Sequence, residues 1–283
     1  VIIDREWPQT AYLVVLLARS GFEVVLASGR PPEPWGLGRY CRLITAGPKG
    51  VDDAEFLTAL LRDEPADIVY AISETTMQVL WTLPPELTAK VFPQVTERQK
   101  QLINDRPAMY EFVGSLGAPV PGSMDVPSAD QLDAAIAKFG LPMVLRGTQG
   151  IGGTQVAVVE SAAEAHAGYA HLRELSPEVP FAQQYLTGQR CLFGGLFDNG
   201  RMLQWFSQTT TEAVRATGPS IRVRSHRNEK LTEYSRRLFE NFGWSGLACA
   251  EYIRGPDGSY TFLEVNPRPW AAILAAHRCG VPL

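Results

Sequence analysis

The stretch Tyr260-Thr-Phe-Leu-Glu-Val-Asn-Pro-Arg-Pro269 carries the most information about the fold of this chain. Its first half has the apolar alternation of a strand, and its two prolines cannot continue a sheet. Glu264 and Asn266 are two residues apart, so their side chains leave the same face, and Arg268 follows just past the strand. Such groups need partners once they are buried. Two oxygen ligands for Mg²⁺ (or Mn²⁺) and a guanidinium for phosphate would satisfy all three.

A second carboxylate, Glu251, lies in the preceding run Leu247-Ala-Cys-Ala-Glu-Tyr-Ile253, and Gly255-Pro-Asp-Gly258 between the runs is a turn signal. A loop of four residues, Pro256 to Ser259, would put Glu251 directly opposite Glu264 on the same face. The two like charges would then repel, and a bound Mg²⁺ would offset the repulsion. A three-residue loop with a bulge would instead put the carboxylates on opposite faces. Two exposed glutamates on a solvated sheet face are the alternative interpretation.

Composition indicates a soluble globular protein of two or three subdomains. The chain has 283 residues, of which 45% are hydrophobic and 20% charged, with a net charge of −4. This charge gives no support for nucleic-acid binding, and no run approaches the ~18 apolar residues of a membrane helix. The four cysteines have no metal-ligand spacing, which favours free thiols in the cytoplasm. The chain begins inside a strand without Met, so we expect a missing or processed start, and its end is equally abrupt.

The first 95 residues alternate strands and helices. Residues 1–4, 22–27, 42–45 and 67–72 read as strands, and 10–19 and 52–62 as helices, which predicts βαβ units and a parallel sheet. No Gly-x-Gly-x-x-Gly motif supports a dinucleotide site. Residues 73–75 follow the last strand, where open α/β sheets place ligands. A helix N-cap with acidic first-turn residues explains these residues equally well.

A glycine-rich segment, 147–153, separates two predicted strands over 141–146 and 154–159. It joins a strand to a strand and lacks the Lys-Ser/Thr ending of a P-loop. Its backbone N–H groups can approach phosphates, and Arg146 beside it is a fixed positive charge. A plain glycine-rich β-turn is the alternative interpretation.

Two further segments are candidates for binding. The run 180–186, ending in Gln183-Gln-Tyr-Leu186, could hydrogen-bond the edge of an adenine through its backbone while Tyr185 and Leu186 supply apolar contact. The polar segment 212–230 carries an arginine cluster with Arg222 and Arg224, which could bind a substrate carboxylate or acceptor. A solvated loop explains that segment equally well. The histidines have no metal-ligand spacing, and no hydrolase triad can be assembled.

Taken in order, these motifs resemble the ATP-grasp superfamily, in particular its carboxylate–amine ligases and the carbamoyl phosphate synthetase and biotin carboxylase types. The resemblance covers nearly the whole chain. It implies α/β and α+β architecture: an N-terminal Rossmann-like pre-ATP-grasp domain over 1–95, then a two-lobed ATP-grasp fold. The lobe with the Gly-rich loop would span 96–186, and the lobe with the metal site would span 187–283. The Phe-Leu-Glu-Val-Asn-Pro-Arg-Pro run is the most specific part of the resemblance.

The resemblance also implies roles for individual residues. Mg²⁺ would be held by Glu251, Glu264 and Asn266, and the transferring phosphate would contact Arg268. The nucleotide would be bound by Arg106, Arg146, Gly152, Gly153, Gln183, Gln184, Tyr185 and Leu186. Superfamily members usually have lysine at the positions of Arg106 and Arg146, and often an acidic ribose ligand where this chain has Arg190.

The implied activity is an ATP-dependent ligation of a carboxylate to an amine, which is amino-acid-like, through an acyl phosphate with release of ADP and phosphate. An acyl phosphate supplies the leaving group that a carboxylate lacks, and phosphoryl transfer needs positioning and charge neutralisation. A carboxylase or kinase on the same scaffold, and a nucleotide-binding module without catalysis, are the alternatives. The substrates would be small molecules, with no nucleic acid and no membrane as partner, and the resemblance allows a homodimer.

Overall fold

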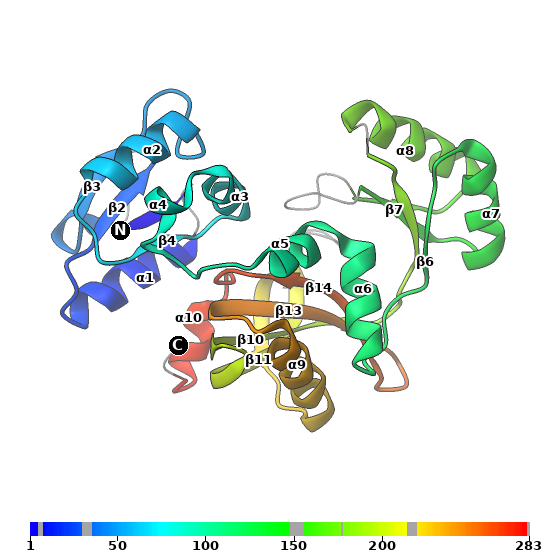
Figure 1. The fold of residues 1–283 in the computed structure, drawn as a ribbon. Coiled ribbons are helices and arrows are strands. Elements are labelled where there is room, and N and C mark those ends of the chain that lie inside the picture. Colours follow the sequence, from blue (N-terminus) through cyan, green and yellow to red (C-terminus); the bar gives the residue numbers. More distant parts are fainter. Residues whose placement is uncertain (5–7, 30–35, 148–155, 177, 214–219, 282–283) are drawn as a thin grey trace.

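The computed structural model describes residues 1–4, 8–29, 36–147, 156–176, 178–213 and 220–281. Three β-sheets, each with its own helices, follow one another along this part of the chain (Figure 1). The fold is a mixed α/β fold. None of the helices within these ranges is both long and apolar enough to cross a bilayer.

The first sheet is parallel, and its strands have the order β3-β2-β1-β4-β5 among the described residues. Its strands are β1 (Ile2–Asp4), β2 (Val25–Ser28), β3 (Arg42–Thr45), β4 (Val69–Ala71) and β5 (Val91–Phe92). The helices of this part are α1 (Pro8–Arg19), η1 (Leu37–Arg39), α2 (Ala54–Asp63), α3 (Glu74–Thr82) and α4 (Pro85–Thr88). The predicted parallel sheet is confirmed. Residue 73 is the N-cap of α3, because Ser73 Oγ accepts the Thr76 N–H at 3.1 Å.

The second sheet is antiparallel with the order β6-β9-β7-β8 among the described residues. Its strands are β6 (Ser123–Asp125), β7 (Met143–Arg146), β8 (Val156–Val159) and β9 (Phe181–Gln184), and its helices are α7 (Ala129–Phe139) and α8 (Ala162–Leu175). Arg146 pairs with Val156, so the predicted strand–loop–strand hairpin is confirmed. The loop itself, with Gly152 and Gly153, lies outside the described residues.

The third sheet is antiparallel with the order β12-β11-β10-β13-β14, and we call it the large sheet. Its strands are β10 (Gln189–Asp198), β11 (Arg201–Ala213), β12 (Ser220–Ser225), β13 (Gly246–Arg254) and β14 (Tyr260–Asn266). The helices associated with it are α5 (Glu97–Asn104), α6 (Arg106–Ser115), α9 (Glu229–Phe242) and α10 (Ile273–Arg278). Strand β12 lies inside the segment expected to be an irregular polar stretch. Its exposed arginines hid the alternation, since an edge strand can be polar on both faces.

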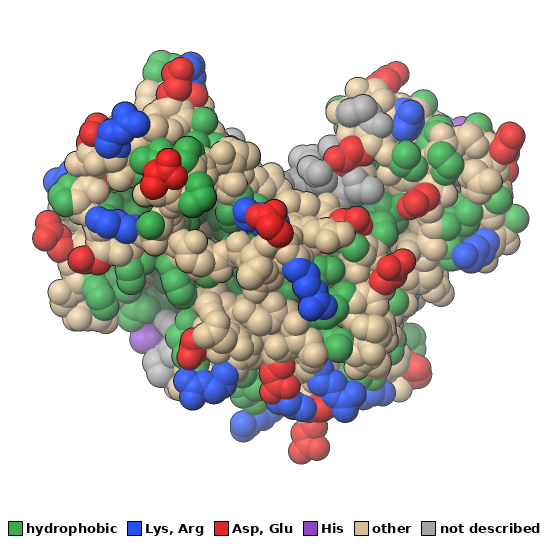
Figure 2. Space-filling view, viewed as in Figure 1, with side chains coloured by type: hydrophobic (Ala, Val, Ile, Leu, Met, Phe, Trp, Pro, Cys, Tyr) green, Lys and Arg blue, Asp and Glu red, His purple; other side chains and the backbone are tan. Residues whose placement is uncertain are grey.

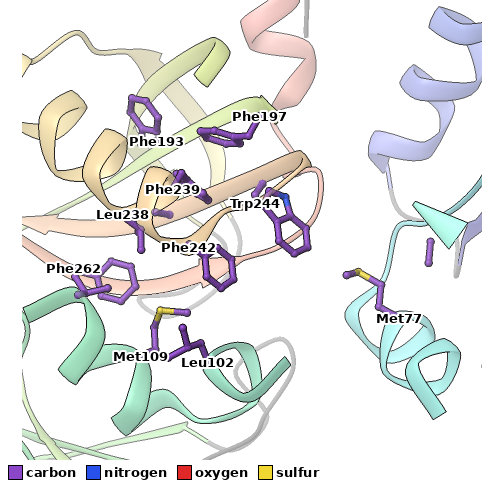
Figure 3. Packing of buried hydrophobic residues seen from close by; sticks show 14 of the residues in the cluster. Met77, Leu102, Met109, Phe193, Phe197, Leu238, Phe239, Phe242, Trp244 and Phe262 are labelled. Atoms are coloured by element: carbon purple, nitrogen blue, oxygen red, sulfur yellow. The ribbon is translucent and has the colours of Figure 1, made fainter. Parts of the chain in front are cut away.

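One face of the large sheet is the main aromatic core. Phe239 and Phe242 of α9 pack onto this face, and Leu102 and Met109 bring α5 and α6 against it (Figure 3). Phe262 of β14 is fully buried here and makes an edge-on contact with the ring of Tyr110 at 6.1 Å. The opposite face of the large sheet holds a second apolar cluster that includes Leu192, Leu247 and Trp270, and it also carries Glu251.

Candidate active site

A β-bulge in β14 places Glu264 on the face of the large sheet that lies away from α9. Tyr252 pairs with Phe262, whereas Glu251 pairs with Glu264, so Leu263 is an extra residue between the two pairs. Without the bulge, Phe262 and Glu264 would leave the same face, because side chains two residues apart do so. With it, Phe262 enters the core while Glu264 points to the other side. Bulges re-aim side chains in this way.

Glu251 lies directly opposite Glu264, which is the arrangement that the four-residue loop would have given. The connection differs from both loops considered, since Arg254 pairs with Tyr260 and the bulge then restores the register. Glu251 makes no hydrogen bond or ion pair with another described residue. Burial, followed by the charge of Glu264, raises the pKa of Glu251 to about 7, although Arg190, Arg268 and Arg106 oppose this rise. Within the described ranges, Glu251 is therefore a buried carboxylate without an ion-pair partner.

Glu264 has two arginine partners. Arg106 Nη1 donates to Glu264 Oε2 at 2.8 Å and also reaches the carbonyl of the bulge residue Leu263 at 3.3 Å. Arg146 Nη2 lies 3.7 Å from the same carboxylate oxygen. Burial raises the pKa of Glu264, but the charges of Arg106 and Arg146 outweigh burial and bring the pKa down to about 2. Glu264 is therefore ionised at neutral pH.

Asn266 links Glu264 to Arg268. The Asn266 side chain is 7% exposed, and its Nδ2 donates to Glu264 Oε1 at 3.3 Å. Its Oδ1 accepts from Arg268 Nη2 at 3.1 Å. Arg268 Nε in turn donates to Glu74 Oε1 of α3 at 3.0 Å. A continuous set of hydrogen bonds thus joins the parallel-sheet region to the polar end of β14.

The opposed carboxylates and the residues around them form a polar cluster that comprises Glu251, Glu264, Asn266, Arg106, Arg146, Arg268 and Glu74. Gln183 brings the second sheet into this cluster. Gln183 is 3% exposed, and its Oε1 accepts from Tyr110 at 3.0 Å and from Arg146 at 3.2 Å. The prediction that Gln183 frames an adenine stays open, and the side chain itself is engaged by Tyr110 and Arg146. The neighbouring Gln184 is exposed because successive strand residues point to opposite faces.

The remaining residues that were predicted to bind the nucleotide follow β9 or lie in the glycine-rich loop. Tyr185 is 38% exposed and Leu186 is half-buried, both directly after β9. Arg190 lies on the Glu251 face of the large sheet, where its charge acts on the pKa of Glu251. Its Nη2 donates to Ser220 Oγ at 3.3 Å. Gly152 and Gly153 fall outside the described residues.

Arg224 is not brought to the cluster. It pairs with Thr209, which pairs with Cys191, which pairs with Tyr252, so all four side chains leave the face that α9 covers. Glu251 precedes Tyr252 on β13, so its side chain leaves the opposite face. Within the described ranges, no hydrogen bond or ion pair connects Arg224 to the carboxylates.

Sequence reasoning missed two members of the cluster. Glu74 was considered as part of a helix start or an isolated ligand site, and its partner Arg268 is 194 positions away. Tyr110 had no signal apart from its place on an amphipathic helix, four residues after Arg106. That spacing puts both side chains on one side of α6, which was the available signal.

The donor set fits a hard divalent cation. Glu251 and Glu264 offer carboxylate oxygens from opposed positions, Asn266 adds an amide oxygen, and Mg²⁺ prefers such ligands. The uncompensated Glu251 is the observation that supports this fit. Figure 2 shows that the surface is hollowed between the part built on the parallel sheet and the part built on the second sheet. In the same view, β14 and α5 lie between these two parts (Figure 1).

The sequence of residues 103–272 matches the family described as an ATP-grasp domain. The chain belongs to the ATP-grasp family. The match includes Arg106, Arg146 and the whole polar end of β14, and it begins after the parallel sheet, so Glu74 lies outside it.

Among curated relatives, the arginine-specific large chain of carbamoyl phosphate synthase from Geobacillus stearothermophilus is 26% identical over 193 residues. The match covers 64% of this chain and 18% of that protein, so the chain spans about a fifth of this relative's length. Many solved structures are similar to this chain in fold. N5-carboxyaminoimidazole synthetase from Staphylococcus aureus, complexed with ADP, has a TM-score of 0.76 at 18% identity, over 98% of this chain and 72% of that chain.

The biotin carboxylase domain dimer of 2-oxoglutarate carboxylase from Hydrogenobacter thermophilus also has a TM-score of 0.76, at 13% identity. This similarity covers 96% of this chain and 65% of that chain, which was solved with MgADP, ADP and bicarbonate. At these identities the similarity concerns the fold.

Proposed function

We propose that the chain is the ATP-using part of a ligase that joins a small carboxylate to an amine through an acyl phosphate, releasing ADP and phosphate. The observation that carries this proposal is the pair Glu251–Glu264, whose members are directly opposed on the face of the large sheet away from α9, beside Asn266. Three arginines, Arg106, Arg146 and Arg268, surround the pair. Carboxylates and guanidiniums in this arrangement suit Mg²⁺ and a triphosphate.

Each group has a defined task in this reaction. Glu251, Glu264 and Asn266 would hold Mg²⁺, which neutralises phosphate charge when bound. The guanidiniums of Arg106, Arg146 and Arg268 would bind phosphate oxygens and hold the γ-phosphoryl group in line with a substrate carboxylate oxygen. That oxygen bonds to phosphorus as the bond to ADP breaks. The amine nitrogen then attacks the acyl carbon, phosphate leaves, and the amine proton passes to solvent.

The same proposal includes the organisation of the chain. Residues 1–95 would be a Rossmann-like pre-ATP-grasp domain, supported by its parallel strand order. Residues 96–186 and 187–283 would be the two lobes, each with one antiparallel sheet. Helices α5 and α6 of the first lobe pack on the sheet of the second, through Met109 and Phe262. Tyr185, Leu186 and Arg190, directly after β9 and at the start of β10, would contact the nucleoside.

The cellular setting is also proposed. Free cysteines and the use of ATP support a cytoplasmic location. The dimer of the 2-oxoglutarate carboxylase domain supports a homodimer, which light scattering would measure.

The test is a coupled assay of ADP release in the presence of MgATP. The wild-type chain is incubated with pairs drawn from carboxylic acids and amino acids, and with bicarbonate as a separate arm. We expect ADP and phosphate release that requires both a carboxylate and an amine, and a new amide bond detected by mass spectrometry. ADP release with bicarbonate alone would favour the carboxylase. MgADP binding by calorimetry without turnover for any pair would favour a module without catalysis.

A further inference from the structure

Glu74 lies outside the matched family region, yet it reaches the polar end of β14. It is the first residue of α3, directly after the carboxyl end of β4. The helix start is held firmly, because Ser73 Oγ caps the Thr76 N–H and Thr76 Oγ1 donates to Asp52 Oδ1 at 2.5 Å. The backbone that carries Glu74 is therefore fixed by the parallel-sheet region itself.

The side chain of Glu74 is committed to one partner. Arg268 Nε lies 3.0 Å from Glu74 Oε1, and the two side chains are 19% and 18% exposed for Glu74 and Arg268. Asn266 takes the Nη2 side of the same guanidinium. Acceptors at both Nε and Nη2 restrict the rotation of this planar group.

We propose that Glu74 is a positioning residue for phosphoryl transfer, acting through Arg268. This inference rests on the proposed function and adds that the parallel-sheet region supplies part of the site. Glu74 and Asn266 hold the Arg268 guanidinium beside the metal ligand Glu264, so the guanidinium needs no reorientation when the γ-phosphoryl group arrives. The role is distinct from that of a tether between two parts of the chain. A tether changes stability and nucleotide affinity, whereas a positioning residue changes the rate of the bound complex.

The experiment is a double-mutant cycle on the whole chain. Glu74→Gln keeps the size and an acceptor oxygen but removes the charge, and Glu74→Ala removes both. Each is made alone and together with Arg268→Lys, which keeps a positive charge but loses the planar fork. Glu55→Ala is the matched control, because Glu55 is also in the first turn of a helix in this region and pairs with Lys49. We measure kcat and KM for ATP in ADP release, the Kd for MgADP, and thermal unfolding.

We expect kcat to fall about 10-fold for Glu74→Gln and about 100-fold for Glu74→Ala, as for partners that orient site ligands. The Kd for MgADP should stay within about 3-fold, and Glu55→Ala should behave as wild type. In the Arg268→Lys background, Glu74→Ala should cost less than about 2-fold further, because the residue acts through the arginine.

Several outcomes would overturn the inference. An unchanged kcat in both Glu74 variants would do so, and so would equal losses with and without Arg268→Lys. A loss confined to the Kd for MgADP or to thermal stability would assign Glu74 as a tether. A wild-type chain that releases no ADP with any substrate pair defeats the proposed function and this inference together, whereas an active wild type with unaffected Glu74 variants defeats this inference alone.

Discussion

Glu251 in the middle of β13 and Glu264 near the end of β14 are the same residue type in directly opposed positions, yet their surroundings differ. Glu264 has the guanidiniums of Arg106 and Arg146 beside it, whereas the Glu251 side chain makes no hydrogen bond or ion pair with a described residue. The pKa values diverge to about 2 and about 7 for Glu264 and Glu251. Opposed carboxylates thus separate into one that is ionised at neutral pH and one whose ionisation a bound cation would favour.

The largest effect that this comparison predicts is on activity. Glu264→Gln should reduce ADP release at least about 1,000-fold and Glu251→Gln at least about 100-fold. In the proposed function both carboxylates hold the divalent ion against the phosphates. Glu212→Gln, on the same sheet and paired with Arg222, is the matched control and should be close to wild type. Steady-state ADP release at saturating MgATP measures all three. Near-normal turnover in Glu264→Gln would remove the metal assignment.

The second effect is on stability, and it should have opposite signs at the two positions. The folded-state pKa of Glu264 is below its ordinary value, so its contribution is present at neutral pH and is lost as pH falls toward 2. The folded-state pKa of Glu251 is above its ordinary value, so folding is increasingly disfavoured as pH rises from about 4.5 through 7. At pH 8 without metal, Glu264→Gln should lower the unfolding free energy by about 1–3 kcal/mol, and Glu251→Gln should raise it by up to about 3 kcal/mol.

Urea unfolding in EDTA at pH 8 and pH 5 measures these differences. At pH 5 Glu251 is already protonated in the folded chain, so the gain from Glu251→Gln should almost vanish while the loss from Glu264→Gln remains. If both variants shift stability in the same direction at pH 8, the two carboxylates do not have the different surroundings described above.

The sequence predicted those parts of this arrangement that depend on residues close together along the chain. Alternation placed Glu264 and Asn266 on one face, and the turn at 255–258 indicated the hairpin that opposes Glu251 to Glu264. Both are local patterns. The bulge at Leu263 was not foreseen, because it reflects the competition between burying Phe262 in the core and keeping Glu264 out of it.

Contacts between distant segments were beyond the reach of local patterns. The pairing of Glu74 with Arg268 spans 194 positions, and that of Arg106 with Glu264 spans 158. The family resemblance indicated that Arg106 binds the nucleotide. It did not indicate that Arg106 contacts Glu264, a predicted metal ligand. For Gln183, the resemblance indicated an adenine contact, which stays a prediction, and it did not foresee that the side chain accepts from Tyr110 and Arg146.

A third effect concerns metal affinity. Since the pKa of Glu251 is about 7 without metal, a proton must leave before the carboxylate can bind a cation at lower pH. The apparent affinity for Mn²⁺ in the presence of ADP should therefore fall by up to about 10-fold per pH unit below 7. Electron paramagnetic resonance of free Mn²⁺ measures this fall, with Glu251→Gln as the reference. That variant should bind more weakly, with a shallower pH dependence, and identical slopes in both proteins would contradict the assignment of Glu251.

The smallest effect is expected at Arg224, which tests whether the face of the large sheet decides function. Arg190 and Arg224 both lie on the large sheet, but their side chains leave opposite faces. Only Arg190 is on the same face as Glu251. Arg190→Ala should weaken MgADP binding about 2- to 10-fold through the lost charge. Arg224→Ala should leave kcat, KM and the Kd for MgADP within about 2-fold, because Arg224 shares a face with Cys191 and Tyr252. A loss at Arg224 equal to that at Arg190 would mean that the acceptor approaches from the edge of the sheet, where the face of a side chain no longer restricts its reach.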